Sequence, residues 1–218
     1  MNSGNYFSQY FAQPSLDLRE PPLVMIHASS RQNLSQNLCL ASDVTVELNR
    51  LAESVEQSAP KCEEAVYHKS ASSKVSPIAF CTLQRAYPSA AARAARAEGT
   101  PFIVSIETRS DSQEPARGGQ TIQYATPTGQ LLAAYIQQGI ASCPYARHLP
   151  TVEPATENGN IASVAATQGI HAVRLICGYT TNYFDYRLLN SFSHSLIKVI
   201  SRAIFKFLTN NPIKAVGL

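Results

Sequence analysis

The 218-residue chain has few charged side chains, since Asp, Glu, Lys and Arg together make up only 15% of it. A typical soluble domain has about a quarter. Ser, Thr, Gln and Asn supply the remaining polarity. A surface with little charge has weak electrostatic solubility and tolerates close packing against neighbours. The composition therefore favours a protein that works in an assembly.

The net charge is also small, at +3 with a sequence pI near 8.6. A dedicated nucleic-acid binder is usually more basic and gathers Lys and Arg on one face. The best candidate is a short alanine-rich segment with Arg93 and Arg96, which offers few phosphate contacts even with Arg85 and Tyr87 nearby. We therefore do not expect nucleic acid as a partner.

The chain lacks the motifs that hold metals and cofactors. Its five cysteines include no Cys-x-x-Cys pair, and no two of its five histidines lie three or four residues apart. These spacings argue against a disulfide framework and against a metal site on one helix face. The glycine-rich motifs of nucleotide sites are also absent. We expect free cysteines, no metal and no cofactor.

Long hydrophobic runs are missing as well. No apolar stretch of about 18 residues occurs, so no transmembrane helix is predicted. The N-terminal segment has neither the basic region nor the apolar region of a secretory signal. The expected location is the cytoplasm.

What the chain does contain is an alternation of helix and strand patterns. Helical spacing and capping residues predict helices at 42–57, 89–98, 127–140 and 185–208. Alternating patterns predict strands at 101–110, 120–126 and 171–179, the first two forming a hairpin. We expect an α+β or mixed α/β fold, with a small sheet of three to four strands covered by helices and a long amphipathic C-terminal helix.

Composition divides the chain into three parts. Residues 1–36 are rich in Ser, Gln, Asn and Pro and are expected to form an extended N-terminal arm, with one short strand at Leu23–His27. Residues 37–209 are predicted to form a single globular domain, and residues 210–218 a short tail. Within the domain, residues 142–160 contain three prolines and are predicted to form a long loop.

Two segments carry apolar side chains in unusual places. The arm holds four aromatic residues, although solvated tails normally avoid them. Residues 195–208 form an amphipathic helix with a wide apolar side, and Phe205 lies among cations on its polar side. Our leading hypothesis is a non-catalytic interaction or assembly protein. It would bind a protein partner or self-associate through Tyr6, Phe7, Tyr10, Phe11, Leu196, Ile200, Ile204, Phe205 and Phe207.

The C-terminal amphipathic helix allows two further interpretations. It could close the protein's own core, which is the usual role of such a helix. It could also lie on a membrane surface, because residues 195–208 have a basic polar face and no acidic residue. A peripheral membrane-surface protein is therefore one alternative function.

A second alternative comes from residues 143–148, Cys-Pro-Tyr-Ala-Arg-His. A thiolate nucleophile needs a base that lowers its pKa and a third group that orients the base. Cys143 as nucleophile and His148 as base would make a small Cys-His thiol hydrolase or transferase, with Asp111 or Glu153 orienting the histidine. The segment supplies the residue types, and only the fold can supply the geometry.

Overall fold

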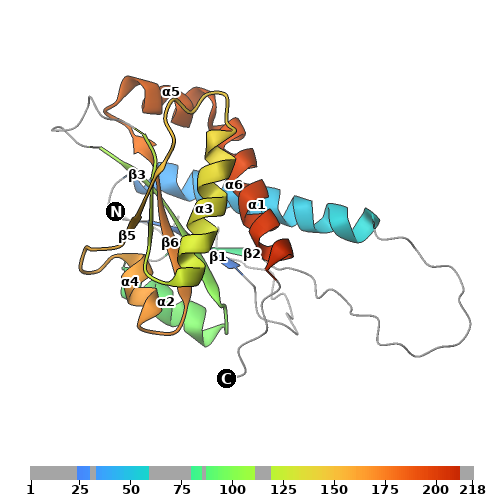
Figure 1. The fold of residues 1–218 in the computed structure, drawn as a ribbon, viewed down its shortest axis with the longest axis vertical. Helices are drawn as coiled ribbons and strands as arrows, with labels where there is room; N and C mark the ends of the chain where they lie inside the picture. The colour runs from blue at the N-terminus through green and yellow to red at the C-terminus, as the bar shows by residue number, and fades with distance from the viewer. Residues whose placement is uncertain (1–23, 30–32, 59–79, 85–86, 111–118, 212–218) are drawn as a thin grey trace, which may run out of the picture.

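The computed structural model describes residues 24–29, 33–58, 80–84, 87–110 and 119–211 and, except at 55–58 and 80–84, their side chains. Six strands in this part of the chain form one sheet in the order β2-β1-β3-β6-β4-β5 (Figure 1). Their bounds are β1 (Val24–Ala28), β2 (Phe80–Gln84), β3 (Phe102–Arg109), β4 (Thr121–Tyr124), β5 (Thr151–Pro154) and β6 (His171–Tyr179). The mixed α/β class is confirmed, and the sheet has six strands instead of three or four.

Neighbouring strands are parallel except for β4 and β6, which are antiparallel. The predicted hairpin of β3 and β4 is therefore wrong, since β6 lies between them. Both β3 and β6 are buried almost from end to end, which is typical of central parallel strands covered on both faces. β1, which falls within the segment assigned to the arm, is an inner strand between β2 and β3.

Helices cover both faces of the sheet (Figure 1). Their bounds are α1 (Leu34–Ser58), α2 (Pro88–Ala97), α3 (Pro127–Ala141), α4 (Ile161–Ala166), α5 (Tyr183–Ser191) and α6 (Ser193–Asn210). The larger core cluster joins α1, α3, α5 and α6 to one face of the sheet, and a smaller cluster joins α2 and α4 to the other. The predicted loop at 142–160 contains β5, which pairs with β4 at the edge of the sheet.

Side chains along β3 alternate between the two faces of the sheet, and this alternation decides which side chains lie on each face. Phe102, Val104 and Ile106 belong to the larger cluster, and Ile103 belongs to the smaller one. Because successive side chains in a strand point to opposite faces, Ser105 and Glu107 share the face of Ile103. The same face is therefore apolar at the start of the strand and polar toward its carboxyl end.

The C-terminal helical segment is broken at Phe192, whose backbone leaves the helical region at φ −126° and ψ 15°. Two helices, α5 and α6, thus replace the single helix predicted over residues 185–208. α6 packs against α1 and α3. Its approach to α3 is close, because a Cβ on Gly139 would lie 2.8 Å from the Cβ of Ala203 and 2.8 Å from the carbonyl oxygen of Val199.

The apolar side of α6 closes the protein's own core. Its four central side chains are at most 1% exposed, and Phe205 is half-buried against the same cluster. The predicted docking role of this helix is therefore wrong, since these side chains are already covered: Leu196, Ile200, Ile204 and Phe207. The four aromatic residues of the arm lie outside the described residues: Tyr6, Phe7, Tyr10 and Phe11.

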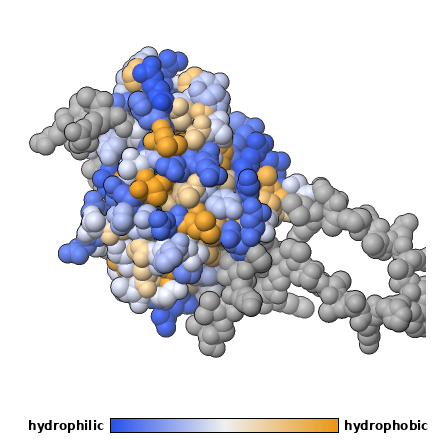
Figure 2. Space-filling model, viewed as in Figure 1, coloured by the Kyte–Doolittle hydropathy of each residue, from blue (hydrophilic) through white to orange (hydrophobic). Residues whose placement is uncertain are grey.

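The surface seen in Figure 2 gives no support to a broad apolar interface. Hydrophobic residues on this face are scattered among hydrophilic ones over the described part of the molecule (Figure 2). Within that part, no helix is long and apolar enough to span a bilayer.

Candidate functional site

A row of polar side chains crosses the sheet on the face covered by α2 and α4. One step earlier along the strands, Met25, Ile103 and Ala172 pair across β1, β3 and β6 and pack under the two helices. The next positions on this face are His27, Ser105 and Arg174, which pair in the same register, with Gln123 of β4 opposite Arg174. The apolar contact with the helices therefore ends where this polar row begins.

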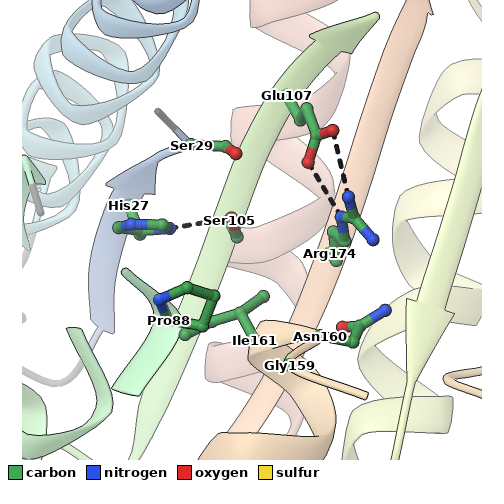
Figure 3. A pocket seen from close by; sticks show the side chains of 9 residues that line it. All are labelled: His27, Ser29, Pro88, Ser105, Glu107, Gly159, Asn160, Ile161 and Arg174. Atoms are coloured by element: carbon green, nitrogen blue, oxygen red, sulfur yellow. Dashed lines mark hydrogen bonds and ion pairs between the residues drawn. The ribbon is translucent and has the colours of Figure 1, made fainter. Parts of the chain in front are cut away.

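A small pocket opens over this row, near the carboxyl ends of β1, β3 and β6 (Figure 3). Ligands of open α/β sheets commonly bind at this edge. The first residues of α2 and α4 form its lower wall in Figure 3. The lining residues are His27, Ser29, Pro88, Ser105, Glu107, Gly159, Asn160, Ile161 and Arg174.

An ion pair between Glu107 and Arg174 is the central feature of the pocket (Figure 3). Arg174 donates from Nε to one carboxylate oxygen of Glu107 at 2.8 Å and from Nη2 to the other at 3.0 Å. Each side chain is 3% exposed. This two-point geometry fixes both groups more firmly than a single contact between point charges would.

Two more charged groups complete the cluster. Arg174 donates from Nη1 to Glu157 at 2.8 Å, and Arg109 donates from Nε to Glu107 at 3.0 Å. A fourth ion pair in the cluster joins Arg109 to Glu157 at 3.8 Å. The four groups therefore carry two positive and two negative charges, which balance.

The pKa values of the central pair follow from this arrangement. Burial alone would raise the pKa of Glu107, but the hydrogen bonds and charge of Arg174, with help from Arg109, outweigh it and hold the pKa below its usual value. Burial acts against the charged form of Arg174 too, yet Glu107 and Glu157 raise its pKa. Both groups are therefore ionised at neutral pH.

Neutral polar groups extend the network on both sides of the ion pair. Gln123 accepts from Asn160 at 2.7 Å and from Arg174 at 3.3 Å, and it donates to Glu153 at 2.8 Å. Asn160 also caps α4 by accepting from the backbone N–H of Ala162 at 2.9 Å. These bonds hold the loop before α4 against the sheet and so position the wall of the pocket.

His27 and Ser105 form a second polar pair, with 2.8 Å between Nδ1 and Oγ. They are 2% and 1% exposed and lie on neighbouring strands. The pair satisfies polar groups that would otherwise be costly to bury. The pair thus places two polar atoms, Nδ1 of His27 and Oγ of Ser105, at fixed positions in the lining of the pocket.

The predicted thiol site does not assemble. Cys143 follows α3 and is buried in the larger core cluster, on the face of the sheet opposite to the pocket, whereas His148 is exposed. Cys177 is also buried, and burial raises the pKa of its thiol to about 12. The thiol hydrolase hypothesis is therefore wrong, because the thiol of Cys143 is enclosed by apolar side chains and the proposed base lies outside in solvent.

Solved structures of similar fold come from amidases. Against the N-acetylmuramoyl-L-alanine amidase of Clostridium difficile 630, the TM-score is 0.64 at 16% identity, covering 88% of this chain and 99% of that one. Against the N-acetylmuramoyl-L-alanine amidase AmiC2 of Nostoc punctiforme it is 0.62 at 14% identity, covering 86% and 97%. The chain therefore has the fold of these amidases.

A third similar structure is the CwlD amidase from Clostridioides difficile in complex with the GerS lipoprotein, with a TM-score of 0.57 at 12% identity. It covers 86% of this chain and 98% of that one. A protein of this fold thus binds a protein partner. No family model matches the sequence of our chain, and no curated protein matches it.

Three predictions are corrected by these likenesses together with the burial of α6. The leading hypothesis of a non-catalytic assembly protein is overturned by a fold shared with amidases over almost their whole length. The membrane-surface alternative fails with it, because the apolar side of α6 is buried. Cytoplasmic residence is overturned as well, because the N-acetylmuramoyl-L-alanine bond belongs to peptidoglycan, which lies outside the cytoplasm.

The described residues do not fit a catalytic metal centre. A hydrolytic zinc ion is usually held by three protein ligands with a fourth position open. Within the described ranges, no three His, Cys, Asp or Glu side chains gather so that they could hold a metal. Glu107 is the carboxylate that lines the pocket, and its two oxygens accept hydrogen bonds from the guanidinium groups of Arg174 and Arg109.

Proposed function

We propose that this chain acts on peptidoglycan and recognises the N-acetylmuramoyl-L-alanine linkage in the pocket over β1, β3 and β6. The observation that carries the proposal is the extent of the likeness. The match takes in 97 to 99% of two amidase chains and 86 to 88% of this one. The resemblance therefore involves the whole amidase domain rather than one common sheet motif.

The chemistry of the pocket supports an amide ligand. Its polar groups include hydroxyls, a carboxamide and an ion pair whose charges balance. An uncharged amide can accept and donate hydrogen bonds in such a site without bringing in an unpaired charge. The amide that joins a muramoyl lactyl group to L-alanine has these properties.

Hydrolysis of the same linkage is a second candidate, and the shared fold favours it. The described residues supply no metal centre for it. The lowered pKa of Glu107 also makes this carboxylate a weak base. Recognition of the linkage is therefore the function that the geometry supports best.

A protein partner is a further part of the proposal. The sequence led us to expect one, and the CwlD complex with a lipoprotein gives a precedent for this fold. We assign no surface of the described residues to that partner.

Co-sedimentation with purified peptidoglycan tests the proposed function. The full chain should pellet with insoluble peptidoglycan, and soluble N-acetylmuramoyl-L-alanine should release it, whereas N-acetylglucosamine should not. Recognition of the linkage would be refuted if the chain stayed in the supernatant. It would also be refuted if N-acetylmuramoyl-L-alanine and N-acetylglucosamine released the chain equally well. New alanine amino groups appearing in the same tube would show hydrolysis and favour the second candidate.

A further inference from the structure

The Arg174 guanidinium has one N–H donor that can form a hydrogen bond with a ligand. Arginine has five N–H groups, and four of those of Arg174 are used: one from Nε, two from Nη1 and one from Nη2. The second N–H of Nη2 has no hydrogen bond to the described residues. Since Arg174 lines the pocket, this donor belongs to a side chain that is already fixed in place.

Ser29 adds a second hydrogen-bonding group. Its backbone is held on both sides, because its N–H donates to Ile106 at 3.0 Å and its carbonyl accepts from Asn37 at 2.8 Å. Its hydroxyl lines the same pocket and makes no hydrogen bond to the described residues (Figure 3). A hydroxyl both donates and accepts, so Ser29 can bond either end of an amide.

The electrostatics of the pocket act against a metal ion. A divalent cation placed beside the buried guanidinium of Arg174 would be repelled by it at short range, where water screens little. The cluster has no net negative charge to offset this repulsion, because the carboxylates of Glu107 and Glu157 are balanced by the guanidinium groups of Arg174 and Arg109. A neutral ligand avoids this repulsion.

We infer that the pocket binds the amide of the N-acetylmuramoyl-L-alanine linkage directly, with Arg174 and Ser29 as hydrogen-bonding partners and with no metal ion between protein and ligand. This inference rests on the proposed function, since it takes the linkage as the ligand. It departs from the metal-dependent chemistry that the amidase fold implies, because an arginine and its carboxylate partner occupy the floor of the pocket.

Calorimetric titration of the full chain tests the inference. The probe is N-acetylmuramoyl-L-alanine carboxamide, which is uncharged. The comparison ligand is N-acetylmuramic acid, which keeps the N-acetyl group but has a free lactyl carboxylate in place of the linkage amide. The carboxamide should bind more tightly, with the same affinity in excess EDTA as in zinc. In parallel, equilibrium dialysis against zinc followed by elemental analysis should find far less than one zinc per chain.

Two variants test the assigned partners. Ser29→Ala should weaken binding of the carboxamide about threefold to tenfold, as expected for one lost hydrogen bond. Ser191→Ala, on the exposed face of α5, is the matched control and should bind as the wild type does. Arg174→Lys keeps the charge but loses the planar fork, and should weaken binding by about tenfold or more. If Arg174→Lys fails to fold, the affinity of Ser29→Ala for the carboxamide still tests the assigned partners.

The possible failures are distinguishable. Binding that disappears in EDTA and returns with zinc, or one zinc retained per chain, would overturn the metal-free site and leave the proposed function standing. Carboxamide binding with unchanged affinity in Ser29→Ala would overturn the assigned partners. No binding of the carboxamide or of peptidoglycan under any condition would overturn the proposed function itself.

Discussion

Glu107 on β3 accepts hydrogen bonds at 2.8 and 3.0 Å from Arg174 on the neighbouring strand β6, and both side chains are 3% exposed. The folded state tolerates two charges buried this far from water only because each charge compensates the other. In the described part of the chain, this pair is the feature that most clearly separates the pocket from an ordinary apolar core. Its energetics can be measured apart from any ligand.

Removing one member of the pair should cost much more than removing both. Arg174→Met leaves the Glu107 carboxylate buried beside Arg109 alone, and should lower the free energy of unfolding by about 3 kcal/mol. The double variant Glu107→Leu with Arg174→Met removes both charges and should recover a large part of that loss. Urea denaturation gives the three free energies, and strictly additive losses would contradict the coupling.

The lowered pKa of Glu107 predicts how stability depends on pH. Its carboxylate favours the folded state above the ordinary glutamate pKa of 4.5, and this contribution is lost as the pH falls through the lower pKa of the folded protein. The free energy of unfolding should therefore fall more steeply below pH 4.5 in the wild type than in Glu107→Gln. Urea titrations at neutral and acidic pH measure both slopes. Parallel curves would show that Glu107 does not titrate as this geometry requires.

Alkylation should separate the cysteines by exposure. Cys39 is exposed, whereas Cys143 and Cys177 are buried and the thiol of Cys177 has its pKa raised to about 12. Iodoacetamide should modify Cys39 in the native protein and leave the other two unmodified until denaturant is added, as mass spectrometry of peptides would show. Native Cys143 reacting as fast as Cys39 would contradict the burial that excludes the thiol mechanism.

Phe207 should behave as a core residue. Its ring packs edge-on against Phe102 and Tyr135, with centroids 5.5 and 5.6 Å apart. Phe207→Ala should lower the free energy of unfolding by about 3 to 5 kcal/mol. Lys206→Ala, exposed on the same helix, should change it by less than about 0.5 kcal/mol. Equal effects in chemical denaturation would mean that α6 does not close the core.

Gly139 should tolerate no side chain although it lies within a helix. Alanine is the better helix former by about 1 kcal/mol, but the added Cβ would meet Ala203 and the backbone of Val199 at 2.8 Å. Gly139→Ala should therefore destabilise the protein by about 1 to 3 kcal/mol. Adding Ala203→Gly should recover only part of this loss, because the Val199 carbonyl stays in place. A more stable Gly139→Ala variant would show that α3 and α6 are not in close contact.

The sequence identified the elements with the most regular patterns. The alternation in residues 102–109 and the pattern at 171–179 located the two central strands, and Pro127 with the apolar residues that follow it at helical spacing located α3. β5 has no such pattern, since it is four residues long, ends in Pro154 and has no buried residue. It exists as a strand because β4 supplies its hydrogen bonds.

The pocket was harder to predict, because strand order creates it. Glu107 and Arg174 are 67 residues apart in sequence, and β6 lies beside β3 only because it enters between β3 and β4. One indication was present: within each of these strands a charged residue directly follows an apolar one, Glu107 after Ile106 and Arg174 after Val173. Two such charges of opposite sign are expected to meet, and this pairing is a better guide than the neighbouring residues Cys143 and His148.

The central claim is that Arg174 contacts the amide of the linkage directly. The most direct test is the ¹⁵N–¹H resonance of the Arg174 side chain during titration of the full chain with N-acetylmuramoyl-L-alanine carboxamide in EDTA. We predict a saturable shift of this resonance together with the Ser29 amide resonance. Saturable binding that moves only resonances far from Arg174 and Ser29, or a shift that appears only when zinc is added, would contradict it.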